Sequence, residues 1–209
     1  MLFNFKSFNN VTNITISDKV KISTNNFYDI FFNMKNLSHV SINMDNVVNM
    51  RCTYQNCQNL IDSPVCGNNV TDMDYTYDRC FNITGNPVCG PNVTNMTYTY
   101  QYCRNLTGSP ACGDKVTNMY FTYYKCYNIT GQPVCGPNVT NMYSTYLYCN
   151  HLTGSPVCGD NVTNMYETYY YCTNITGSPV CGNNVIDMRN AYWGCTNITG
   201  SPVFGNKVK

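Results

Sequence analysis

Cysteine is the residue type in this chain whose spacing best suits chemistry. The 14 cysteines among 209 residues form two series with a 23-residue period, and Cys52 stands apart. The pattern suits a ladder of disulfides, a metal store or rows of buried thiols that act as small apolar residues. The first series is Cys57, Cys80, Cys103, Cys126, Cys149, Cys172 and Cys195, and the second is Cys66, Cys89, Cys112, Cys135, Cys158 and Cys181.

The sequence is compatible with two oxidation states of these cysteines. A disulfide ladder would join each cysteine of the second series to the next cysteine of the first, as in Cys66–Cys80, and would leave Cys52 and Cys57 over. The alternative is free thiols, which we favour because the second series is expected to face outward, away from the first. The start of the chain also lacks the apolar stretch and cleavage site of a secretory signal.

Other catalytic constellations are missing from the sequence. It has no CxxC pair, His39 and His151 lie in unrelated copies of the repeat, and Glu167 is the single glutamate. The glycines follow the repeat period and not a phosphate-binding loop. We therefore expect no enzyme activity, no catalytic residue, no metal site and no cofactor.

The cysteines belong to a unit of 23 residues, which repeats nine times from Met1 and leaves Val208 and Lys209 over. We number the positions of the unit 1 to 23. From residue 47 onward, seven copies hold Val at position 1, Met at 4, Tyr at 8, Cys at 11 and Leu or Ile at 14. A fixed period of this length predicts a solenoid, in which each coil packs only on its neighbours.

Two elements are expected in each coil. Apolar residues at positions 1, 4, 8, 11 and 14 predict a short helix, capped by the Asn at position 23, such as Asn92. Positions 15 to 21 predict an extended return with a short parallel strand near positions 19 and 20. The alternation of the second copy predicts that Ser155 and Val157 face inward and that Pro156 and Cys158 face outward.

Two segments divide the chain. Residues 1–46 carry the repeat in altered form, without cysteine or proline. There Phe8, Val11 and Ile14 are expected at the places of Tyr, Cys and Leu or Ile. We interpret residues 1–46 as divergent amino-terminal capping repeats and residues 47–209 as seven regular repeats, because terminal repeats face water on one side.

The motif VTNMxxxYxxCxxL, which runs from Val93 to Leu106 in one copy, resembles the BspA-type leucine-rich repeat proteins, in particular their surface-protein branch. The resemblance covers about residues 24–207, and the return half departs from it, with GSPVCG in place of a Leu-rich strand. It implies an α/β repeat solenoid that is leucine-rich-repeat-like, with short helices and short parallel strands. It also implies a surface-exposed recognition or adhesion module of bacteria, their phages or certain protists, without catalytic residues. In those repeats the position-11 cysteine has no partner at position 20, which favours free thiols.

Tyrosine supplies the candidate ligand surface. Seven of the 19 tyrosines occupy position 8 of the expected core, and others fall at positions 5, 6 and 9, off the apolar stripe. Aligned from coil to coil, they predict columns of rings that either bind a protein or glycan or only stabilise the stack. The candidates are Tyr75, Tyr98, Tyr120, Tyr124, Tyr143, Tyr166, Tyr170 and Trp193.

Composition limits the partners. Charged residues make up only 11% of the chain and the net charge is +1, so we expect no nucleic-acid partner. No run of 18 apolar residues occurs, so we expect no membrane span. We predict a recognition or adhesion solenoid that binds a protein or glycan, located outside the cell or displayed on a cell or phage surface. The lack of a signal peptide leaves a cytoplasmic location open.

The alternative function is a structural or self-assembling repeat protein, a spacer or a fibre component. The ninth copy is only mildly altered, so a solenoid that stops there would leave its last core face open. Ile198, Val203 and Phe204 would lie on that face. They are the candidate residues for self-association of the chain as a homo-oligomer.

Overall fold

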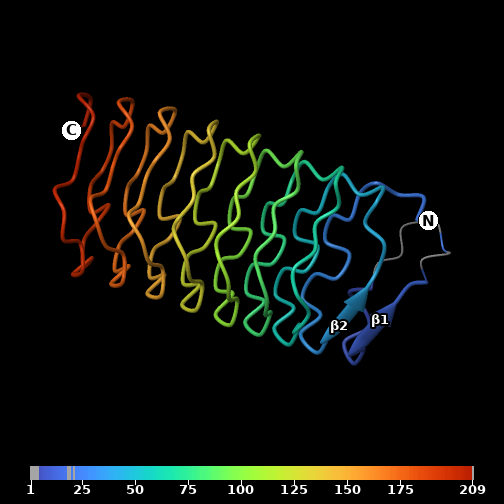
Figure 1. The fold of residues 1–209 in the computed structure, drawn as a ribbon. Coiled ribbons are helices and arrows are strands. Elements are labelled where there is room, and N and C mark those ends of the chain that lie inside the picture. The colour runs from blue at the N-terminus through green and yellow to red at the C-terminus, as the bar shows by residue number, and fades with distance from the viewer. Residues whose placement is uncertain (1–4, 18–19, 21, 209) are drawn as a thin grey trace.

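The computed structural model describes residues 5–17, 20 and 22–208. The chain winds into a row of stacked coils that runs from the amino-terminal to the carboxyl-terminal end (Figure 1). Equivalent residues recur every 23 positions in neighbouring coils, as the solenoid prediction requires. The architecture is thus a repeat solenoid whose coils contact their sequence neighbours.

Regular secondary structure is sparse in this solenoid. Strand β1 (Asn13–Thr15) pairs in parallel with β2 (His39–Ser41), with Ile14 opposite Val40. The later coils are joined by isolated parallel bridges at position 3, from Asn26↔Asn49 to Asn164↔Asp187. Near the carboxyl-terminal end, Val157↔Val180 and Val180↔Val203 add parallel bridges at position 19, within the return segment where a short parallel strand was expected. The described residues contain no helix, so the expectation of a short helix in each coil is wrong.

Consecutive β-turns take the place of the expected helix. The amide of Thr99 donates to the carbonyl of Met96 (3.1 Å), and the amide of Cys103 donates to that of Tyr100 (3.0 Å). The third residues of these turns, Tyr98 and Tyr102, have φ of 53° and 61°. Positive φ at that place alone defines a type II turn. Since type II turns also advance the chain by three or four residues per corner, they produce the apolar spacing that was attributed to a helix.

Every second backbone amide of the turn-rich half donates a hydrogen bond to a backbone carbonyl of the next coil. Tyr98 N–H donates to the carbonyl of Tyr120 and Tyr100 N–H to that of Thr122, both at 2.9 Å. The same pattern recurs from coil to coil at positions 4, 6, 8 and 10. A left-handed backbone at a non-glycine residue costs about 1–3 kcal/mol, and these inter-coil hydrogen bonds offset that cost.

A ladder of stacked rings forms the centre of the core. From Tyr54 to Tyr192 the position-8 rings stack with centroids 5.1–5.5 Å apart and planes within 11° of parallel. The side chains at positions 1, 4, 11 and 14 of the central coils are fully buried beside them. The inward direction predicted for these five positions is therefore confirmed.

The first coil is longer than the sequence interpretation assumed. Phe5, not Phe8, packs against Phe31 of the ring ladder, with ring centroids 5.5 Å apart and planes tilted by 31°, and Phe8 is 54% exposed. Phe5, Phe8 and Val11 thus hold the places that the prediction gave to Phe8, Val11 and Ile14. The spacing between the first two coils is 26 residues, as the pairing of Ile14 with Val40 also shows. The capping role of residues 1–46 stays a prediction.

The return segment faces opposite to the prediction. Pro156 is buried and Cys158 is 5% exposed, whereas Val157 is 48% exposed and Ser155 half-buried. The proline ring fills core space, and the sulfur of the position-20 cysteine accepts a backbone amide, as Cys158 Sγ does from Gly182 (3.0 Å). The side chains of this segment therefore alternate as in a strand, but Pro156 and Cys158 face inward instead of Ser155 and Val157.

Polar side chains join the coils at fixed positions. Thr99 Oγ1 donates to the carbonyl of Met73 (2.9 Å) at position 7. The Asn at position 23 does not cap a helix: Asn92 Nδ2 donates to the carbonyl of Asn68 in the coil before (2.9 Å). Because such bonds recur from coil to coil, neutral polar residues hold the stack together where charges are few.

Candidate functional site

The position-11 cysteines form a buried column in the core, and most of the position-20 cysteines are half-buried. All 14 are free thiols in the structure, and the position-11 cysteines from Cys57 to Cys172 are fully buried. Each donates to a carbonyl of the preceding coil, as Cys103 Sγ does to Tyr77 (3.0 Å). Burial raises the pKa of the Cys57 thiol to about 12. A thiolate, the reactive form, is thus strongly disfavoured in this column.

Neither histidine lies near the cysteine columns in a metal-binding arrangement. His39 Nδ1 contacts Asp62 (2.9 Å), and His151 Nδ1 lies 2.6 Å from the carbonyl of Tyr127. Within the described ranges, no group of three His, Cys, Asp or Glu side chains could hold a metal ion. The outer aromatic residues therefore remain the best candidates for a functional site.

The predicted tyrosines gather on one side of the coils in a first column at positions 5 and 6. Tyr75 stacks on Tyr98 (4.4 Å), and Tyr120 leads through Tyr143 to Tyr166 with ring centroids 5.0 and 4.7 Å apart. Tyr98 and Tyr120 meet edge to face at 5.2 Å. Five of the eight predicted residues thus form one continuous row.

A second column lies beside the first at positions 9 and 10. It contains Tyr124, which meets Tyr102 edge to face (5.1 Å), and Tyr170, which lies against Tyr148 (5.9 Å) and Tyr171 (4.9 Å). Phe121 links the columns, since it contacts Tyr124 in one and Tyr98 and Tyr143 in the other. Both columns together are called the aromatic face below.

Sequence reasoning missed part of this face. Tyr102, Tyr148 and Tyr171 stand at position 10, which the predicted surface did not include. Phe121 stands at position 6, where the prediction counted tyrosines and left phenylalanine out. Trp193, which was predicted, is 60% exposed in the last coil and makes no ring contact with another described residue. Aromatic residue type together with the period could have found all of them.

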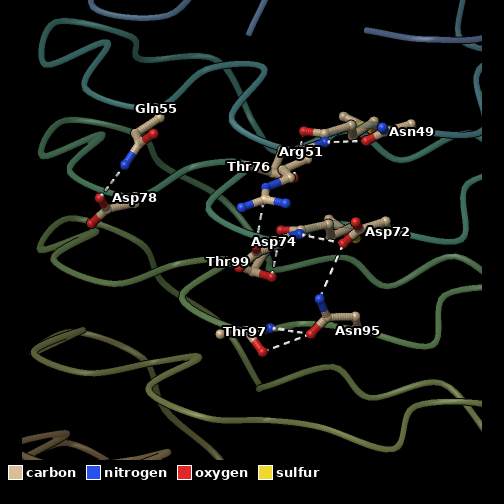
Figure 2. A network of polar contacts seen from close by, with 12 residues as sticks. Asn49, Arg51, Gln55, Asp72, Asp74, Thr76, Asp78, Asn95, Thr97 and Thr99 are labelled. Atoms are coloured by element: carbon tan, nitrogen blue, oxygen red, sulfur yellow. Dashed lines mark hydrogen bonds and ion pairs between the residues drawn. The ribbon is translucent and has the colours of Figure 1, made fainter. Parts of the chain in front are cut away.

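Polar residues hold positions 5 and 9 in the coil that precedes most of the aromatic columns in the sequence, and Figure 2 shows the network of contacts that they make. Position 5 holds Asp74 there, paired with Arg51 (Nε–Oδ2 3.2 Å), and position 9 holds Asp78, whose Oδ2 accepts from Gln55 Nε2 (3.0 Å). Burial raises the pKa of both carboxyl groups to about 6. One oxygen of each, Oδ1, has no hydrogen-bond partner among the described residues.

Two adjoining hollows lie where the polar network meets the aromatic face. One, of about 390 Å³, is lined by Asp78, Arg79, Gln101, Tyr75 and Tyr98 among others. The other, of about 240 Å³, is lined by Arg79, Phe81, Tyr102 and Arg104. Arg79 belongs to both, so the two hollows share a wall.

Comparisons of the chain with protein-family models, with curated protein sequences and with solved structures give no match. The resemblance to BspA-type repeats therefore stays a prediction. No apolar helix of membrane-spanning length occurs in the part of the chain that the structure describes.

Proposed function

We propose that the chain is a non-enzymatic recognition or adhesion solenoid that binds a protein or glycan through its aromatic face. The observation that carries this proposal is the concentration of outer rings on one side of the coils, in two linked columns. The position-8 ladder already stacks the coils in the core. A second set of rings at the surface suits contact with a ligand, since partly exposed aromatic side chains are typical of binding surfaces.

Ring orientation bears on the kind of ligand. Tyr143 and Tyr166 stack with an interplanar angle of 18°, and Tyr148 and Tyr171 with one of 21°. These four side chains are at least partly exposed, so each can offer a polar hydroxyl group next to apolar ring surface. That combination suits a neutral polar ligand, either the hydroxyl groups of a glycan or the backbone of a protein segment.

The proposed function also implies a location for the chain and a family to which it would belong. A recognition solenoid of the BspA type would be extracellular or displayed on a cell or phage surface, with a cytoplasmic location still open. Binding of the 209-residue chain to a glycan array and to candidate surface proteins tests the function. A saturable ligand supports it, and the absence of any saturable ligand, with association of the chain alone, supports the alternative.

The alternative is a structural or self-assembling repeat protein. Val203 is 55% and Phe204 51% exposed, and Ile198 is partly buried next to them in the last coil. Either a further coil or a second copy of the chain would bury Ile198 and Phe204, whereas Val203 stands at position 19, whose valines stay exposed between neighbouring coils as well, as Val157 does at 48%. Light scattering over a wide concentration range distinguishes the cases: self-association that Phe204→Asp abolishes supports this alternative, and a strictly monomeric parent chain contradicts it.

A further inference from the structure

Cations and aromatic rings alternate in a small block of the surface beside the aromatic face. Position 10 holds Arg79, Tyr102 and Lys125 in three successive coils. Position 12 holds Phe81, Arg104 and Tyr127 in the same coils, so each cation has a ring before or after it in its column. We call these six residues the cation–ring block.

The rings hold the cations in place. The Arg104 guanidinium lies 5.0 Å from the centroid of Phe81, and that of Arg79 lies 5.7 Å from Tyr102. Lys125 Nζ lies 5.3 Å from the same Tyr102 ring. A cation over a ring face is attracted to it but keeps its charge. The N–H groups of the two arginines thus remain available at the hollow that they line.

Carboxylates do not balance these charges. Asp78 lies 3.8 Å from Arg79 Nε, and neither Arg104 nor Lys125 forms an ion pair with any residue that the structure describes. The block and Asp78 together therefore carry a net charge of +2, from three cations and one carboxylate. The whole chain carries only +1. Three cations that fixed backbone positions keep within a few coils of each other favour an anion between them.

The adjoining hollow has a different chemistry. Gln55, Asn56 and Gln101 present amide groups there, and Asp78 is 2% exposed at its wall. Amides and a carboxylate can donate to and accept from neutral hydroxyl groups. The buried carboxylate disfavours a polyanion, which would bring further negative charge beside it. The two hollows together suit a ligand with one anionic group and one neutral, hydroxyl-bearing part.

We infer that this bipartite hollow binds an acidic saccharide, with its carboxylate or sulfate between Arg79 and Arg104 and its neutral ring against Gln101 and Asn56. The inference rests on the proposed recognition function and names its ligand class. Charge-assisted hydrogen bonds from two arginines give the anionic group its orientation. Because the arginines are exposed, added salt weakens the binding.

Calorimetric titration of the full chain tests the inference with three probes: 3′-sialyllactose, 6-sulfated N-acetyllactosamine and lactose. We expect at least one acidic probe to bind at least about tenfold more tightly than lactose, and Arg104→Gln to remove that advantage. The matched control is Arg189→Gln, since Arg189 also lies over a ring, that of Tyr166 (5.1 Å), but far along the chain and paired with Asp187. The control should bind as the parent chain does. The carboxylate and sulfate probes show which anionic group is preferred.

Three results would overturn the inference. The first is that the acidic probes bind no more tightly than lactose. The second is that Arg104→Gln and Arg189→Gln lose equal affinity for the acidic probe. The third is that free sulfate or a phosphotyrosine peptide binds as tightly as the acidic saccharide. If the acidic probes fail in one of these ways while a protein or neutral glycan still binds the parent chain saturably, the anionic site is overturned and the recognition function stands. Circular dichroism of both variants checks that they are folded.

Discussion

The hydroxyl of Tyr100 makes two hydrogen bonds with the backbone of Val88, which precedes it by 12 residues. It donates to the carbonyl at 2.8 Å and accepts from the amide at 2.9 Å. Tyr77, Tyr123 and Tyr146 repeat the arrangement in their own coils. The core ring thus ties the turn-rich half of one coil to the return segment of the coil before it, which has few other backbone partners there.

Removing this hydroxyl should destabilise the fold. Tyr100→Phe keeps the stacked ring but leaves the amide and carbonyl of the half-buried Val88 without their partner. We expect a loss of about 1–3 kcal/mol in the free energy of unfolding, measured by urea denaturation. Tyr102→Phe removes a hydroxyl from the outer surface and is the control. An equal, small effect of both changes would contradict the role of the Tyr100 hydroxyl.

The turn structure predicts an unusual response to glycine. Glu167 is at position 6 with φ of 51°, a left-handed conformation that glycine adopts without strain. Glu167→Gly should therefore leave stability unchanged or raise it by up to about 1 kcal/mol relative to Glu167→Ala. In a helix the glycine would instead cost about 1 kcal/mol relative to alanine. Thermal unfolding of the two variants distinguishes the two backbones.

Acid should stabilise the coil that contains the buried carboxyl groups. Burial raises the pKa of Asp78 to about 6, above its usual value near 4, so the folded chain holds a proton that the unfolded chain releases. The free energy of unfolding should thus fall as pH rises from about 4 to about 6. Asp78→Asn should remove part of this dependence and be more stable at pH 7, on the order of 1–3 kcal/mol. Asp114→Asn, at an exposed position, is the control. A pH profile that is unchanged in Asp78→Asn would contradict the account.

Alkylation measures the state of the cysteines. In the folded chain the position-11 thiols should resist iodoacetamide, because they are buried and burial raises their pKa. After unfolding without a reductant, all 14 should be alkylated. Mass spectrometry reads both results. Peptides that join Cys66 to Cys80 and Cys89 to Cys103 would show the disulfide ladder instead.

The period of the sequence predicted the solenoid and its inward positions, but not the backbone. Spacing of three and four residues fits successive β-turns as well as a helix, and the left-handed positions hold residues such as Tyr98, Phe121 and Lys125. These residue types give no turn signal, because glycine and asparagine are the usual ones. Hydrogen bonds to the next coil stabilise them, and such bonds cannot be read from a single coil.

The prediction of which side chains of the return segment face inward was wrong for a related reason. The prediction extended the alternation of the second coil to Val157, but Pro156 follows a left-handed Gly154 (φ 80°), which shifts the inward set by one residue. A shift of one residue in an extended segment exchanges its two faces. The aromatic face was predicted from residue type alone. Its position-10 members were identified only from the ring contacts in the structure, such as that of Tyr102 with Tyr124.

The aromatic face is the central claim about function, and paired variants test it most directly. Titrations of a ligand from the glycan or surface-protein screen compare the parent chain with a variant in which Tyr143 and Tyr171 are both serine. A second variant, Val157→Ser, changes an exposed apolar residue on the return segment. We predict that the tyrosine variant loses at least about tenfold in affinity, since aromatic anchors dominate such surfaces, and that Val157→Ser binds as the parent chain does. Undiminished binding by a folded tyrosine variant, or an equal loss in Val157→Ser, would contradict the claim.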